Sequence, residues 1–238
     1  MFSNRLIVAG MATMASRAHT FSIAFESIVN QVDYLYLYLD GHSDVPQPAR
    51  NNPRVVSFFS RDIPGLRGNG KFLGLHFAPA KCLYLGVDDD IRYPPDYTSR
   101  LRAAINAQHG RAVVGYHGSI FTHPFISYRQ SRIVKNFAKQ LDSTTIVDTL
   151  GTGTLLFDTA VLRFDVCKWT HVNLLDLCFA IEAAKAKVPL ICLPRPHGFL
   201  HALEREQSDS IYAALKRDDR RQTMLALQLQ ALKASNVN

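Results

Sequence analysis

The stretch Lys81-Cys-Leu-Tyr-Leu-Gly-Val87, followed by Asp88-Asp-Asp90 and Ile91-Arg-Tyr-Pro-Pro-Asp-Tyr97, is the most informative part of the chain. Its apolar half predicts a buried strand, and its prolines predict an abrupt turn into a helix. Adjacent carboxylates repel one another, so a fold that gathers them at a strand end usually has a cation for them. Oxygen ligands of this kind suit Mg²⁺ or Mn²⁺, and strand ends are where α/β sheets bind ligands. The alternative is a solvated acidic turn.

Composition sets broad limits on the protein. The chain has 238 residues and a formal net charge of +7, which suits one large domain with an anionic partner. Nucleic acid is not expected, because zinc-finger spacing, a recognition-helix signature and an RNP-like strand are all missing. No apolar run has the length of a membrane span, and the run at 6–9 is too short for a signal peptide. The cysteines lack paired metal spacing, so we expect reduced thiols in a cytoplasmic protein.

Apolar strands alternate with amphipathic helices, which predicts an α/β fold. We expect strands at 5–10, 33–39, 54–59, 81–87, 112–116, 151–157 and 189–193, and helices at 17–31, 71–78, 94–108 and 172–187. Ser16 is the expected N-cap of the first helix. In strand 33–39 leucines and tyrosines alternate, so each type faces one side of the sheet. The segment 117–147 has no clear pattern. We expect a domain at 1–205 and a basic helical extension at 206–238.

The order of these features resembles the family 2 glycosyltransferases of the GT-A fold, over most of residues 5–200. The stretch Glu26-Ser-Ile-x-x-Gln31 is similar to the end of that family's first helix, and 88–97 is similar to its metal-binding DxD segment and the following helix start. The chain looks closest to bacterial members found among capsule and surface-polysaccharide enzymes. The resemblance implies a Rossmann-like, mixed and mostly parallel sheet flanked by helices, with C-terminal helices.

When the residues are matched one by one, the resemblance implies a group of residues that bind the nucleotide and the metal. Asp40 would accept hydrogen bonds from the nucleobase, preferably uracil, and Lys71 would meet the phosphates or ribose. Asp90 would ligate Mn²⁺ or Mg²⁺ directly, and Asp88 would contact the ribose, the metal or a metal-bound water. Asp89 would point to the other face of the strand. The simpler alternatives are a turn residue for Asp40 and an exposed helix-start lysine for Lys71.

The resemblance also implies a catalytic base and, after the last predicted strand, one residue that contacts the metal and one that contacts the diphosphate. Asp176 would take the proton of the acceptor hydroxyl, although the family's usual Glu-Asp pair is here Leu175-Asp176; its alternative is an acidic residue favoured by a helix dipole. His197 would add a metal ligand, or be a structural loop histidine. Arg195 would bind the diphosphate, and His117 would face the sugar or simply begin a polar loop.

The resulting expectation is a metal-dependent, inverting transfer of sugar from a nucleotide diphosphate, favoured as UDP-linked, to a hydroxyl of a glycan or lipid-linked glycan in surface-glycan synthesis. The glycine-containing run Gly151-Thr-Gly-Thr154 would line the acceptor side. The basic, leucine-striped tail suits a peripheral membrane contact or a homodimer. Two alternatives are a sugar-1-phosphate nucleotidyltransferase, disfavoured because only Gly10 lies in its required glycine-rich loop, and a non-catalytic nucleotide-sugar-binding domain.

Overall fold

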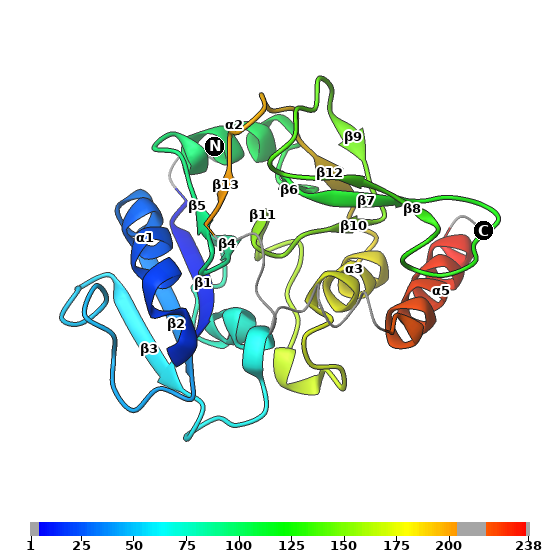
Figure 1. Cartoon of the computed structure of the whole chain (residues 1–238). Coiled ribbons are helices and arrows are strands. Elements are labelled where there is room, and N and C mark those ends of the chain that lie inside the picture. The colour runs from blue at the N-terminus through cyan, green and yellow to red at the C-terminus, as the bar shows by residue number, and fades with distance from the viewer. Residues whose placement is uncertain (1–4, 204–217, 237–238) are drawn as a thin grey trace.

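The central feature is a mixed sheet of eight strands (Figure 1). The computed structural model describes residues 5–203 and 218–236, and all structural statements refer to these. In spatial order the strands are β3 (Val55–Phe59), β2 (Tyr34–Asp40), β1 (Ile7–Met14), β4 (Leu83–Val87), β11 (Thr154–Asp158), β6 (Val113–Gly115), β12 (Leu190–Cys192) and β9 (Thr145–Ile146). Neighbours pair in parallel except at β11 and at β9, which run antiparallel to the strands beside them. The predicted mixed, mostly parallel sheet flanked by helices is confirmed.

Two small sheets extend the fold. The first has the order β10 (Thr149–Leu150), β7 (Gly118–Phe121) and β8 (Arg132–Lys135), and the second pairs β13 (His201–Ala202) with β5 (Ile91–Arg92). Three of these strands, together with β9, lie in or just beyond the segment 117–147, which the sequence left unassigned. They are short, and their partners are distant in sequence.

The helices cover both faces of the main sheet (Figure 1). The α-helices are α1 (Ala18–Ile28), α2 (Tyr97–Ala107), α3 (Leu175–Lys185) and α5 (Arg220–Ser235), and the 3₁₀ helices are η1 (Ala15–Arg17), η2 (Val29–Gln31), η3 (Arg67–His76) and η4 (Val166–Lys168). Lys71 therefore lies inside a 3₁₀ segment rather than in a helix beginning at 71. Ser16 belongs to η1, and Arg17 holds the N-cap position of α1, where its side chain makes no capping hydrogen bond, so the predicted Ser16 cap is wrong.

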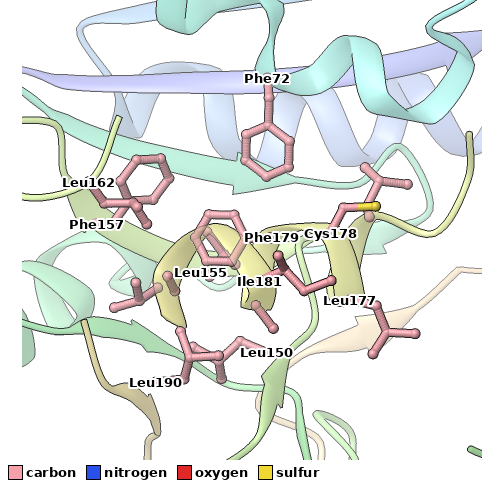
Figure 2. Close-up of a cluster of buried hydrophobic side chains, with 14 of the residues drawn as sticks. Phe72, Leu150, Leu155, Phe157, Leu162, Leu177, Cys178, Phe179, Ile181 and Leu190 are labelled. Atoms are coloured by element: carbon pink, nitrogen blue, oxygen red, sulfur yellow. The ribbon is translucent and has the colours of Figure 1, made fainter. Parts of the chain in front are cut away.

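Strand β2 separates two hydrophobic cores. Its leucines pack with α1 and α2 on one face, and Tyr36 and Tyr38 pack with η3 on the other. This confirms the alternation predicted for 33–39. Figure 2 shows the second core, where Phe72 of η3 stacks on Phe179 of α3 with ring centroids 5.6 Å apart. The packing fixes η3 and α3, which carry predicted site residues, on the same side of the sheet.

The C-terminal helix α5 lies along α3 (Figure 1). Leu225, Ala226 and Leu229 of α5 are buried, and Lys233 Nζ donates to Asp148 Oδ1 at 2.6 Å. Of the extension predicted at 206–238, residues 206–217 (with Lys216 and Arg217) and 237–238 lie outside the described residues. No described helix is long and apolar enough to cross a membrane.

Candidate active site

The strand order places the aspartates at the point where the sheet changes direction. From β1 the chain moves outward to β2 and β3, and then returns to the other side of β1 as β4. In open α/β sheets the crevice at such a switch, beyond the carboxyl ends of the strands, is the usual ligand site. Asp88 directly follows β4, and Asp40 ends β2 opposite Met14 of β1. Strand β1 lies between β2 and β4, so the strands that lead to Asp40 and Asp88 are about 10 Å apart.

Each end of the aspartate triplet faces a cation. Lys71 Nζ donates to Asp88 Oδ1, and the lysine side chain is only 5% exposed. Arg17 Nη1 lies 3.6 Å from Asp90 Oδ2. The carboxylates of Asp88 and Asp90 remain 38% and 34% exposed. Both are therefore held by the protein and reachable from solvent, which is what ligation of a bound ion requires.

The triplet holds more negative charge than its two cations offset. Burial first, and then the charge of Asp88, raise the pKa of Asp89 to about 6, while Thr13, Arg17 and Lys71 act in the opposite direction. Burial, Asp88 and Asp89 raise the pKa of Asp90 to about 7. The neighbouring carboxyl groups resist ionisation because their negative charges repel one another. A hard divalent cation binds oxygen donors and would compensate this charge. The chemistry of these oxygen donors suits Mg²⁺ or Mn²⁺, and Asp90 and Asp88 are the residues that would hold the ion; the three carboxylates of the triplet are not gathered within 4.8 Å of one another.

A glycine in β1 allows Lys71 to reach Asp88. A Cβ on Gly10 would come within 1.8 Å of the Lys71 carbonyl oxygen and 2.3 Å of the Tyr84 hydroxyl. Tyr84 donates a hydrogen bond of 2.7 Å to that same carbonyl. Only glycine lets η3 approach β1 this closely. Gly10 is therefore a strand residue with a packing role, and it does not lie in a phosphate-binding loop.

The turn Gly151–Gly153 connects the aspartate triplet with Asp176. Thr152 donates to Asp176 Oδ1 from its backbone nitrogen at 2.9 Å and from its hydroxyl at 3.0 Å. On the other side, a Cβ on Gly153 would come within 1.8 Å of Asp88 Oδ2. Asp88 and Asp176 thus pack against successive residues of one turn. Both of these hydrogen bonds to Asp176 go to the same oxygen, Oδ1.

The segment after the triplet is fastened to the end of α1. Ser27 Oγ accepts from the Tyr93 backbone nitrogen at 3.1 Å, and Gln31 Nε2 donates to the Pro94 carbonyl at 2.8 Å. The Tyr93 hydroxyl accepts from the Asp88 nitrogen and donates to the Gly153 carbonyl, both at 2.8 Å. Ser27 and Gln31, noted above only through the family resemblance, therefore have a physical role: they position the chain beyond the aspartates.

His117 lies behind the same turn. Its carbonyl accepts from the Gly151 nitrogen at 2.9 Å, and a Cβ on Gly151 would come within about 3 Å of its ring. Burial lowers the pKa of His117, and Asp176 is the strongest influence in the opposite direction. His117 is therefore a neutral, half-buried residue close enough to Asp176 to sense its charge.

Arg195 and His197 do not have the surroundings that their predicted roles in binding the diphosphate and the metal would lead one to expect. Arg195 is 4% exposed, and its guanidinium donates to the Lys135, Asn136 and Leu193 carbonyls at 2.6–3.0 Å. It fastens the main chain near β12, which leaves no reason to assign it to a diphosphate. His197 is exposed, and it is not part of any described group of three His, Cys, Asp or Glu ligands within 4.8 Å of one another.

Arg17, Tyr93 and Thr152 were not predicted from the sequence. Arg17 and Tyr93 had a usable signal, since Tyr93 lies three residues beyond the triplet and Arg17 lies three residues beyond the end of β1. Thr152 had none, because its partner Asp176 is 24 residues away. The antiparallel pairing of β11 with β4 brings the turn next to Asp88, and the hydrogen bonds of Thr152 link it to Asp176 of α3.

Comparison with protein-family models and with curated proteins gives no match. Among solved structures, glucosyl-3-phosphoglycerate synthase from Mycobacterium tuberculosis in complex with Mn²⁺, UDP-glucose and phosphoglyceric acid is 19% identical, with a TM-score of 0.38. The match covers 47% of this chain and 43% of that one. The structure of that enzyme with Mg²⁺ and UDP is 18% identical, with a TM-score of 0.36, and the match again covers 47% of this chain and 43% of that one. The similarity spans less than half of either chain.

Proposed function

We propose that this protein is a metal-dependent glycosyltransferase of the GT-A type that transfers a sugar from a nucleotide diphosphate, favoured as UDP-linked, to a hydroxyl acceptor. The observation that carries the proposal is the turn Gly151–Gly153, which puts Asp176 on one side and the aspartates of the switch point on the other. A cation site beside a positioned carboxylate base is the equipment that this transfer needs.

The donor would lie across the switch point. Asp40, at the end of β2, would accept from the N–H edge of the base, and Asp88 and Asp90 would hold the divalent cation beyond β4. A span of about 10 Å between these strand ends suits a nucleoside diphosphate. When bound, the cation would offset charge on the departing diphosphate. Lys71, already paired with Asp88, would add a positive charge beside the phosphates.

The acceptor would lie toward Asp176. Its Oδ1 is held by Thr152, so Oδ2 would take the proton of the attacking hydroxyl while the diphosphate leaves from the opposite face of the sugar. Inversion at the anomeric carbon follows from this single displacement. We further propose that the acceptor is a glycan or lipid-linked glycan of a surface polysaccharide, a role supported by the family 2 resemblance of the aspartate segment.

The test is transfer and donor hydrolysis with a panel of nucleotide sugars, with Mn²⁺, with Mg²⁺ and with EDTA. We expect EDTA to abolish turnover, and Asp90→Ala to reduce it by a hundredfold or more, that is by about 3 kcal/mol or more of barrier. Asp96→Asn is the matched control, since Asp96 is an exposed carboxylate paired with Arg100 at 2.6 Å. Undiminished turnover in Asp90→Ala would exclude the metal role.

The alternatives give different products. A nucleotidyltransferase would release pyrophosphate from a nucleoside triphosphate and a sugar phosphate. The position of Gly10 inside β1 disfavours it, because no glycine-rich loop follows that strand. A non-catalytic binding domain would bind the donor by calorimetry without transferring it. A membrane role has one supporting feature, the exposed Met224 and Leu227 of the basic helix α5, and vesicle co-sedimentation would test it.

A further inference from the structure

A second group of metal-ligating side chains lies away from the aspartate triplet. The ligand atoms of His76, Asp165 and Cys167 all lie within 4.8 Å of one another. His76 ends η3, Asp165 is the N-cap of η4, and Cys167 lies within η4. The segment that carries Asp165 follows Asp158, which pairs with Leu83 at the start of β4. His76 lies five residues beyond Lys71 in η3, and none of the three residues belongs to the aspartate triplet.

The spacing of the three side chains matches a coordination shell. His76 Nε2 and Asp165 Oδ1 are 3.0 Å apart. Two ligands bound about 2.05 Å from a tetrahedral zinc ion are separated by about 3.3 Å, and a thiolate lies slightly farther out. An ion could thus replace the direct His76–Asp165 contact with little movement of either side chain. His76 and Asp165 are about one-third exposed and Cys167 is exposed, so water can complete the shell.

The frame around the group is built by buried contacts. Arg163 Nη2 donates to the Leu75 carbonyl at 2.6 Å and to the Ala78 carbonyl at 2.8 Å, which ties the chain before Asp165 to both sides of His76. Asp165 Oδ1 also accepts from the Cys167 nitrogen at 3.0 Å, and Val166 between them is fully buried. Supporting contacts of this kind orient ligands before a metal arrives.

From this geometry we propose that His76, Asp165 and Cys167 form a binding site for Zn²⁺ or a similar borderline transition metal. The ligand types decide the class of ion. A thiolate and an imidazole favour Zn²⁺ and Co²⁺ over Mg²⁺ and Mn²⁺, which prefer all-oxygen sites such as the aspartate triplet. The protein would then carry two metal sites of different chemistry.

The consequence of binding is structural. The ion would cross-link the end of η3 to η4, and η3 is also the element that carries Lys71. Because the ion binds the folded chain and its ligands come from separate segments, zinc should raise the melting temperature. The alternative account is that His76 and Asp165 form an exposed ion pair and Asp165 caps η4, with no affinity for metal.

Cobalt is the sharpest probe, because a cobalt–thiolate bond gives a charge-transfer absorption band. Tag-free protein is treated with EDTA, dialysed and titrated with Co²⁺. We expect one equivalent to give the band, Zn²⁺ to displace it, and excess Mn²⁺ to leave it. Cys167→Ser should abolish the band, and His76→Ala and Asp165→Asn should weaken Co²⁺ binding by roughly tenfold or more. Asparagine retains the capping function of residue 165.

Two controls separate this site from others. His19→Ala removes an exposed histidine of α1 and should leave the band unchanged. Asp90→Ala should also leave it unchanged, so the result does not depend on the proposed transferase activity. The proposal is overturned if the wild-type protein gives no thiolate band, if the band persists in Cys167→Ser, or if His76→Ala and Asp165→Asn bind Co²⁺ as tightly as the wild type.

Discussion

Thr152 donates two hydrogen bonds to a single oxygen of Asp176, from its backbone nitrogen at 2.9 Å and from its hydroxyl at 3.0 Å. The backbone bond would survive any substitution except proline, but the hydroxyl bond depends on the side chain. The threonine therefore fixes the orientation of the carboxylate, and under the proposed function Oδ2 is the oxygen that would take the acceptor proton.

Replacing Thr152 should slow the reaction without weakening donor binding. A hydrogen bond to a charged group contributes about 1.5–3 kcal/mol, so Thr152→Val should lower kcat roughly ten- to a hundredfold. Thr152→Ser keeps the hydroxyl and should retain most of the rate. Steady-state kinetics with the donor that the nucleotide-sugar panel selects provide the measurement, and an equal loss in both variants would contradict a positioning role for the hydroxyl.

Removing Lys71 should destabilise the fold through Asp88. The lysine is buried, and its partner carboxylate is partly solvated, so Lys71→Met should cost about 1–3 kcal/mol in the free energy of unfolding. Urea unfolding of Lys71→Met, Asp88→Asn and the double variant gives the coupling energy. Lys185→Met is the control, because Lys185 forms an exposed pair with Glu182 and should change stability by about 0.5 kcal/mol or less.

The C-terminal helix should unfold together with the domain. Leu229 of α5 is fully buried against the second core, whereas Leu227 is 51% exposed. Leu229→Ala should lower the unfolding free energy by about 2–5 kcal/mol, and Leu227→Ala should change it by about 0.5 kcal/mol or less. A separate, earlier transition for α5 by hydrogen exchange would show instead that the helix is an independent appendage.

Acid should destabilise the protein in part through His117. Burial lowers its pKa, with Arg132 and Arg195 acting in the same direction and Asp176 and Asp88 in the other. Below the ordinary histidine pKa of about 6.5 the unfolded chain binds a proton that the folded chain resists, so stability falls as the pH drops. The raised pKa values of Asp89 and Asp90 act in the opposite direction over the same range, so the test, by urea unfolding, compares two proteins. Between about pH 7.5 and pH 5.5, the unfolding free energy of His117→Asn should fall less, or rise more, than that of the wild type.

Sequence patterns predicted the parts of the fold that depend on local alternation. The leucines and tyrosines of β2 take opposite faces, and the aspartates follow a buried strand as expected. The region around 117–147 could not be assigned, because its strands are only two to four residues long and pair with distant partners. Periodicity needs more residues than such strands contain.

Site residues could be predicted where they are adjacent in the sequence. The aspartates 88–90, which directly follow a buried strand, are the example. Arg195 was not predictable, since the carbonyl groups that bind it come from residues 135 and 136, about 60 positions away. The ligands of the proposed zinc site are also split, with His76 far from Cys167 in sequence. For this reason cysteine spacing alone pointed to no metal.

The turn at 151–153 has a consequence for motion. Asp176 bonds to Thr152, and Asp88 packs against the neighbouring Gly153, so both carboxylates rest on consecutive residues of one turn. A hinge movement that separated them would have to break one of these two contacts. Under the proposed function, we therefore expect opening and closing to come from peripheral segments, with little change in the distance between the metal site and the base.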